Sequence, residues 1–368
     1  MAFVPHPLPP SEPPLQLPPE RLARVAEAEK ALAQLELAAE LVPSVEWFLY
    51  AFVRKEAVLS SRIEGTQASL VDLLSFEANQ DPEASPSDDL GEVCNYLEAI
   101  AFAREELQRE GGLPISTRLI NEVHRRLMTG ARGANKRPGE VRQSQNWIGG
   151  TRPGNAVFVP PPPEALPELL SDLERYVHSD DDLPSLVRIG LIHAQFETLH
   201  PYLDGNGRTG RMLITLLLED RGLLSQPLLY LSLYFMRHRQ EYYRRLDSIR
   251  VGDWEGWTDF FLEGVATIAT ESVATARELY ALVNADRTRV LAADTSSVMG
   301  LRLLEQLPQH PVVSAGRVTR LLDTSAPTAH KAIELLEGLG VLREVTGRRR
   351  DRTYRYEAYL DRLGAGEE

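Results

Sequence analysis

The side chains best suited to chemistry lie in one short stretch, from His200 to Arg211. The imidazole can accept a proton near neutral pH, because the unperturbed pKa of histidine lies in that range. Asp204 provides a carboxylate of the kind that Mg²⁺ takes alongside the oxygens of substrate phosphates. Read together, the stretch predicts transfer of a phosphorus group from a nucleotide to a hydroxyl. The remaining small and polar residues suit an anion: Gly205, Asn206, Gly207, Arg208, Thr209, Gly210 and Arg211.

Two apolar segments must hold this stretch in place. Residues 183–199 have the pattern of a buried helix, and so do residues 212–218. A helix that restarts near Asn206 would point its free N–H groups and the positive end of its dipole into the intervening turn. Arg208 and Arg211 would share one face of that helix and grip phosphate oxygens together. We therefore expect a nucleotide site in a turn between two core helices.

The stretch resembles the signature of Fic-domain proteins, His-x-Phe-x-Asp/Glu-Gly-Asn-Gly-Arg-x-x-Arg. Characterised members of this family mostly transfer AMP from ATP to the hydroxyl of a protein Ser, Thr or Tyr. The resemblance implies that His200 is the base for the target hydroxyl and that Asp204 is the Mg²⁺ ligand. It also implies that Gly205–Gly207 cradle the phosphates, while Arg208 and Arg211 hold the β- and γ-phosphates.

A second motif, Ser60 to Gly65, ends a predicted helix over residues 43–63. Its spacing puts Ser60 and Glu64 one turn apart on one face and makes Gly65 a candidate C-cap, which by itself describes only an exposed helix end. The segment also resembles the family's inhibitory motif, Ser/Thr-x-x-x-Glu-Gly/Asn. That resemblance implies that Glu64 pairs with Arg211 and competes with the γ-phosphate of ATP, so that the enzyme restrains itself. In some relatives the same Glu positions a water molecule for removing AMP.

The residue pattern changes between 130 and 163, where two short extended segments around a Gly- and Pro-rich turn predict a β-hairpin. A surface hairpin is the simplest interpretation. Fic proteins have a flap here, which the resemblance places at about residues 146–160, and it binds the target protein by backbone pairing. Ile148, Gly149 and Gly150 would close over the nucleotide.

Four positions depart from the family or have two interpretations. Tyr202 stands where the family has Phe, so its hydroxyl needs a partner. Tyr242 and Tyr243 match a pair that lines the adenine and ribose pocket in relatives, but they also fit the core stripe of a helix over 228–250. Arg250 replaces an Asn of the relatives, which leaves base selectivity open.

The composition is that of an ordinary globular protein, with 43% hydrophobic and 25% charged residues among 368. A net charge of −13 argues against a nucleic-acid coat but allows one basic patch. Cys94 is the single cysteine, so no internal disulfide can form. No apolar run is long enough to span a membrane or to act as a signal core, and we expect a cytoplasmic protein.

The chain divides into an all-α body with additions at both ends. Residues 1–19 hold eight prolines and predict an extended arm on the surface. Residues 20–85 form an N-terminal helical region with the inhibitory motif, and residues 86–290 form the catalytic core. That core ends with a long helix that begins near Asp253. Residues 79–89 are expected to be a polar linker, and Ser116 is expected to cap the helix that follows it.

Residues 296–360 predict a separate C-terminal unit. Helices near 298–307, 314–322 and 325–339, followed by a strand, a turn over 346–351 and another strand, resemble a winged helix-turn-helix. Six arginines between 343 and 355 would suit phosphate contact. The last helix, however, carries few side chains that read bases. Contact with DNA and contact with protein, including a homodimer, both stay open.

Two other functions compete with the leading prediction of an ATP- and Mg²⁺-dependent protein adenylyltransferase. Glu197, His200 and Asp204 could serve a metal-dependent phosphodiester hydrolase, although the second Glu-x-x-His of a di-metal bundle is missing. A nucleotide-sensing DNA-binding regulator would bind ATP without labelling protein, whereas a transferase would lose its label in His200→Ala. The target protein, the modified residue and the oligomeric state are open.

Overall fold

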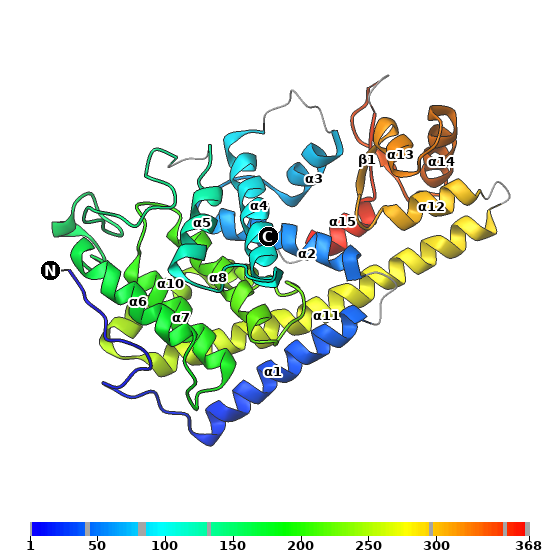
Figure 1. Cartoon of the computed structure of the whole chain (residues 1–368). Helices are drawn as coiled ribbons and strands as arrows, with labels where there is room; N and C mark the ends of the chain where they lie inside the picture. The colour runs from blue at the N-terminus through cyan, green and yellow to red at the C-terminus, as the bar shows by residue number, and fades with distance from the viewer. Residues whose placement is uncertain are drawn as a thin grey trace.

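The computed structural model describes residues 2–40, 45–79, 86–130, 134–293, 297–348 and 352–364. Two long helices run side by side along the body, α1 (Pro19–Glu40) and α11 (Trp254–Ala292) (Figure 1). Asp253 caps α11 by accepting the N–H of Gly256 at 2.9 Å, as its place before an apolar run predicts. The predicted long helix is confirmed and continues to Ala292.

The helices α7 (Ser185–Leu199) and α8 (Asn206–Asp220) form the centre of the body. Nearly every residue of α7 is buried, because other helices surround it, and its polar side chains such as His193 and Glu197 are buried together with the apolar ones. Ser116 caps α5 through the N–H of Leu119, as predicted. The helices that surround the central pair are α2 (Val45–Ile63), α4 (Asp88–Gln108), α5 (Thr117–Leu127), α6 (Leu166–Val177), α9 (Ser232–Arg237) and α10 (Arg239–Ser248).

Two details differ from the sequence predictions. The helix predicted over 228–250 is divided into α9, α10 and the short 3₁₀ helix η3 (Ile249–Val251), with the break at His238. The helix α3 (Leu70–Asn79) was not predicted, and it ends where the polar linker was expected to begin. Residues 80–85 of that linker lie outside the described part.

The Pro-rich arm lies on the body, as predicted. The backbone N–H of Phe3 donates to the carbonyl of Val159 at 2.9 Å, and Gln195 donates to the carbonyl of His6 at 2.9 Å. Gln16 donates its backbone N–H to Glu255 of α11 at 2.9 Å. Among the described residues, no helix is both long enough and apolar enough to cross a membrane.

The C-terminal unit contains the predicted elements and two more. Its helices are α12 (Val298–Gln306), α13 (Ala315–Leu321) and α14 (Ala326–Gly338), and its antiparallel sheet has the order β1–β3–β2. The strands are β1 (Val312–Ser314), β2 (Arg343–Glu344) and β3 (Thr353–Arg355), and α15 (Glu357–Gly364) follows them. Its assignment as a winged helix, its contact with DNA or protein and a homodimer stay predictions. The tip of the predicted turn, 349–351, lies outside the described residues.

Candidate active site

A cavity of about 440 Å³ opens beside the N-terminus of α8. Several predicted site residues meet there, from the end of α2, the flap, α7, α8 and α10. The signature contributes His200, Gly207 and Arg211 to the wall. The residues that line the cavity are Glu64, Trp147, Ile148, Val157, Glu197, His200, Gly207, Arg211, Tyr242, Tyr243, Leu246, Asp247 and Arg250.

His200 ends α7 in the left-handed region, with φ 46° and ψ 60°, which is an unfavourable conformation for a residue with a Cβ. The buried side chain of Arg142 holds it there by donating to the His200 carbonyl at 2.9 Å. The same guanidinium donates to the carbonyl of Pro161 at 2.6 Å, and the Arg142 backbone N–H donates to Pro201 at 2.9 Å. Arg142 therefore ties the base of the flap to the candidate catalytic histidine, a role that its sequence position does not reveal.

The imidazole of His200 is suited to accept a proton. Its Nδ1 is buried and has no hydrogen-bond partner among the described residues. Loss of solvation lowers the pKa of His200 to about 4, although the backbone of Glu197 and, to a smaller extent, the charge of Glu64 oppose the shift. The ring is therefore neutral at pH 7, which is the protonation state that a general base requires.

The signature turn is built from contacts among its own residues. Gly205 has a φ of 76° and precedes α8, and a Cβ on it would lie 2.6 Å from the sulfur of Met128. Asn206 closes the turn, because its amide accepts from the N–H of Tyr202 and donates to the Tyr202 carbonyl, both at 2.9 Å. Thr209 donates to the carbonyl of Gly205 at 2.9 Å. The side chains of Asn206 and Thr209 thus brace the turn and do not line the cavity.

Close packing explains two other glycines of the signature. A Cβ on Gly210 would lie 2.4 Å from Oε1 of Glu197, so this glycine lets α7 and α8 approach each other. A Cβ on Gly207 would lie 2.2 Å from Oε1 of Glu64. Gly207 therefore leaves room for the Glu64 carboxylate at the start of α8. The sequence predicts the same close approach for a bound ligand.

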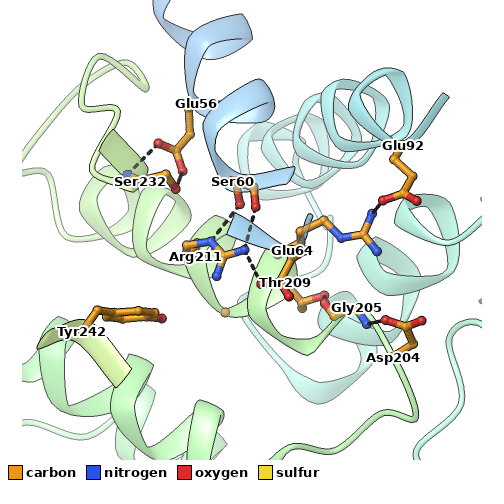
Figure 2. Close-up of polar contacts among 12 residues, drawn as sticks. Glu56, Ser60, Glu64, Glu92, Asp204, Gly205, Thr209, Arg211, Ser232 and Tyr242 are labelled. Carbon is orange, nitrogen blue, oxygen red and sulfur yellow. Dashed lines mark hydrogen bonds and ion pairs between the residues drawn. The ribbon is translucent and has the colours of Figure 1, made fainter. Parts of the chain in front are cut away.

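Arg211 and Glu64 form the predicted pair. Nη2 of Arg211 lies 2.7 Å from Oε1 of Glu64, and the guanidinium also donates to the carbonyl and hydroxyl of Ser60 at 2.8 and 2.9 Å (Figure 2). Burial tends to lower the pKa of Arg211, but the charge of Glu64, its hydrogen bond and the other neighbouring groups together outweigh burial and raise that pKa. Gly65 follows α2 with a φ of 102°, as a C-cap glycine does.

Arg208 does not join Arg211 at the cavity. Its guanidinium lies 2.7 Å from Glu92 of α4, and both side chains are nearly fully buried. A second nitrogen of Arg208 lies 3.5 Å from the sulfur of Met128. The two arginines face different partners in this structure, because α4 supplies a buried carboxylate next to α8. That they hold one ligand together stays a prediction.

Tyr202, the departure from the family's Phe, has a partner for its hydroxyl. It donates to Asn121 at 2.7 Å, and its ring stacks on His124 with centroids 3.7 Å apart. Nε2 of His124 lies 2.9 Å from the carbonyl of Asp204, and Nδ1 accepts the N–H of Gly139 at 2.8 Å. Because a carbonyl can only accept, Nε2 carries the proton. His124 thereby fixes the backbone of Asp204, and no motif in the sequence indicates this contact.

The two tyrosines have different surroundings: Tyr242 is buried in the core, and Tyr243 lies at the rim of the cavity. The buried Tyr242 donates to Nε2 of His193 at 2.9 Å, because Nδ1 of His193 must donate to the Gly210 carbonyl. Its ring nevertheless lines the cavity, and Tyr243 is 41% exposed at the rim. Arg250 lies over the ring of Phe158, 3.3 Å from its centroid.

The flap is a hairpin held by a single β-bridge, Ile148 to Phe158, with a 3₁₀ turn over Pro153–Asn155. Of the three residues predicted to close over the nucleotide, only Ile148 lines the cavity. Gly149 and Gly150 have φ values of 68° and 70° and let the chain turn. Prolines at 160–163 cannot donate backbone hydrogen bonds, which limits longer strands.

Glu197 is a buried carboxyl in the cavity wall, one turn before His200. Its Oε1 has no hydrogen-bond partner among the described residues, and burial raises its pKa to about 7. No group of three or more His, Cys, Asp or Glu side chains is gathered as a metal-ligand set in the described part of the chain. Glu197, His200 and Asp204 are thus not assembled as the hydrolase interpretation requires.

Comparisons with known proteins identify one family. The Fic/DOC family N-terminal model matches residues 22–105, and the Fic/DOC family model matches residues 114–218. A probable protein adenylyltransferase of Aquifex aeolicus is 26% identical over 208 residues, 56% of this chain and 58% of that protein. Protein adenylyltransferase Fic of Drosophila erecta is 27% identical over 204 residues, 55% of this chain and 38% of that protein. The chain thus spans little more than half the length of the first relative and less of the second.

Solved structures share the fold. A Fic family protein from Desulfovibrio desulfuricans G20 has a TM-score of 0.58 at 20% identity, covering 93% of this chain and 97% of that one. Fic-1 from Caenorhabditis elegans has a TM-score of 0.53 at 22% identity, covering 73% of this chain and 75% of that one. These likenesses concern the fold alone, and they confirm the predicted all-α core with its hairpin flap.

Proposed function

Because this chain belongs to the Fic/DOC family, we propose that it is a protein adenylyltransferase that transfers AMP from ATP to a hydroxyl side chain of a target protein. The curated relatives described above carry that name. The observation that carries the proposal is the cavity with His200, Gly207 and Arg211 in its wall. It combines a neutral base, a helix N-terminus and a guanidinium, which are the groups that a hydroxyl and a triphosphate need.

His200 acts as the general base in this proposal. It takes the proton of the target hydroxyl, whose oxygen forms a bond to the α-phosphorus of ATP while the bond to the departing pyrophosphate oxygen breaks. The negative charge of the bound triphosphate raises the low pKa of His200 and makes the ring a stronger base. Arg142 keeps the ring in position through the His200 carbonyl.

Asp204 is suited to the Mg²⁺ that such a transfer uses. Its Oδ1 accepts the N–H of Gly205 at 2.7 Å, and His124 holds its carbonyl, so the carboxylate has a fixed place before α8. Mg²⁺ usually takes one or two carboxylates together with phosphate oxygens, so Asp204 and the nucleotide would hold it. The ion would supply positive charge to the phosphates.

Glu64 restrains the resting enzyme in this proposal. It occupies the Arg211 nitrogen that would otherwise bind a terminal phosphate. ATP must therefore displace a carboxylate or bind in a poor orientation. The target enters along the flap, 146–160, where Ile148 and Val157 reach the cavity, and backbone pairing would place its hydroxyl near His200.

Mass spectrometry of intact wild type, Glu64→Gly and His200→Ala tests the proposal after incubation with ATP and Mg²⁺. A mass increase of one AMP in Glu64→Gly, absent when His200→Ala is added, supports transfer. ATP binding without label on this chain or on added proteins indicates a nucleotide-sensing regulator instead. Release of AMP from labelled protein by wild type, lost in Glu64→Gly, indicates that the resting enzyme removes AMP.

A further inference from the structure

We propose that the C-terminal unit, residues 297–348 and 352–364, clamps the helix that carries Glu64 and so sets how firmly Arg211 is blocked. This inference rests on the proposed function, because it concerns regulation of the same site. Figure 1 shows α15 beside α2 and β1 beside α3, although these elements lie at opposite ends of the sequence. The clamp consists of two separate contacts on α2 and α3.

The first contact is a buried lysine of α2. Lys55 is 1% exposed, and its ammonium donates to the carbonyl of Leu363 in α15 at 2.6 Å. It also lies 4.7 Å from the centroid of the Tyr230 ring, which belongs to the catalytic core. A buried ammonium is costly unless acceptors surround it. The end of α15 is therefore one of the groups that hold α2 in place.

The second contact joins the C-terminal unit to both α2 and α3. The largely buried Arg317 of α13 donates to the backbone carbonyl of Glu77 in α3 and to Nδ1 of His310, the latter at 2.9 Å. The ring of His310 meets the Tyr50 ring of α2 edge-on, with centroids 5.9 Å apart. Gln309 donates to Glu46 at the start of α2 at 3.1 Å.

The helices α2 and α3 respond to these contacts together. Glu77 accepts from the Tyr50 hydroxyl, and it pairs with Arg54 at 2.8 Å. Further along α2, Ser60 binds Arg211, and so does Glu64, which directly follows the last residue of α2. Lys55 and Glu64 are separated by about 14 Å along a helix that rises 1.5 Å per residue. Because α2 is continuous between them, a shift at the clamp moves the inhibitory carboxylate.

Thermodynamic linkage gives the sign of the effect. Contacts that favour the docked α2 also favour the Glu64–Arg211 pair, and ATP competes with that pair. Loosening the clamp should therefore raise AMP transfer, and displacing Glu64 should loosen the clamp. No bound partner is required for either change.

Two variants test the first direction, Lys55→Met and Arg317→Met. Arg343→Met is the matched control, because Arg343 pairs at 2.8 Å with Glu357 inside the C-terminal unit. We expect both test variants to incorporate AMP severalfold to tenfold faster than wild type, and the control to remain at the wild-type rate. In a Glu64→Gly background the same substitutions should add nothing. The clamp is overturned if both test variants incorporate AMP at the wild-type rate while Glu64→Gly is labelled. It is also overturned if the two substitutions raise the rate by the same factor in the Glu64→Gly background as in wild type. Both outcomes leave the proposed function intact.

Hydrogen exchange of the full chain tests the second direction without any transfer assay. Glu64→Gly without nucleotide should exchange the amides of 357–364 severalfold faster than wild type, while amides of α7 stay protected. Unchanged exchange in 357–364 overturns the clamp even if no AMP transfer is found. Because this arm needs no substitution at Lys55 or Arg317, it decides the matter if thermal unfolding shows that those variants do not fold.

Discussion

Replacing Glu64 by Gly should tighten ATP binding through the freed guanidinium of Arg211. A hydrogen bond to a charged group contributes about 1.5–3 kcal/mol, so removing this competitor should lower the Kd for ATP by roughly tenfold to 150-fold. The lower end is favoured, because the Glu64 side chain is 35% exposed and water screens part of the attraction. Arg211 keeps its two contacts with Ser60 and stays in position.

Calorimetric titration of wild type, Glu64→Gln and Glu64→Gly with ATP and with AMP measures this effect. Glu64→Gln keeps the shape but loses the charge, so its affinity for ATP should lie between the other two. AMP has no β- or γ-phosphate, so its affinity should change by less than about threefold, which is under 1 kcal/mol. Equal ATP affinities for all three proteins would refute the assignment of Arg211 to the terminal phosphates. An AMP affinity that changes by the same factor as the ATP affinity would refute it too.

Three further predictions concern the base and the buried pairs. With Mg²⁺ in excess, kcat/KM for ATP of Glu64→Gly should stay level from pH 7.5 to 6, because kcat/KM reports the free enzyme, in which burial lowers the pKa of His200 to about 4. An imidazole with an ordinary pKa would be half protonated near pH 6.5. Arg142→Met should reduce the transfer rate by about 100-fold with ATP affinity unchanged in titration, since it frees the His200 backbone. Glu92→Ala should lower the free energy of unfolding in urea by about 3–5 kcal/mol, because Arg208 stays buried without this carboxylate. Glu98→Ala, at an exposed position of the same helix, should cause a far smaller change.

The turn between α7 and α8 could be predicted because its determinants are local. Gly205 and Asn206 shape the backbone within a few positions of His200, so their spacing alone indicates a sharp bend and a new helix. The pairing of Glu64 with Arg211 spans 147 positions, and only the family resemblance made it predictable.

Partners distant in sequence could not be predicted in the same way. Arg142 and His124 hold the site by hydrogen bonds to backbone carbonyls, which leave no pattern in the sequence. Arg208 and Arg211 look equivalent by spacing, and only the neighbouring α4 decides that Arg208 faces Glu92. The sequence of the flap predicts a regular hairpin, because its residue pattern indicates two extended segments. That pattern does not determine how many backbone hydrogen bonds form between them.

The contact between the Pro-rich arm and the flap has a consequence for the direction from which a target approaches. The backbone N–H of Phe3 already donates to the carbonyl of Val159 in the returning flap segment. A target peptide that pairs with the flap as proposed above would have to align near 146–148 or first displace the arm. Under that proposal, shortening the arm would open a second orientation for the target and change which hydroxyls reach the imidazole.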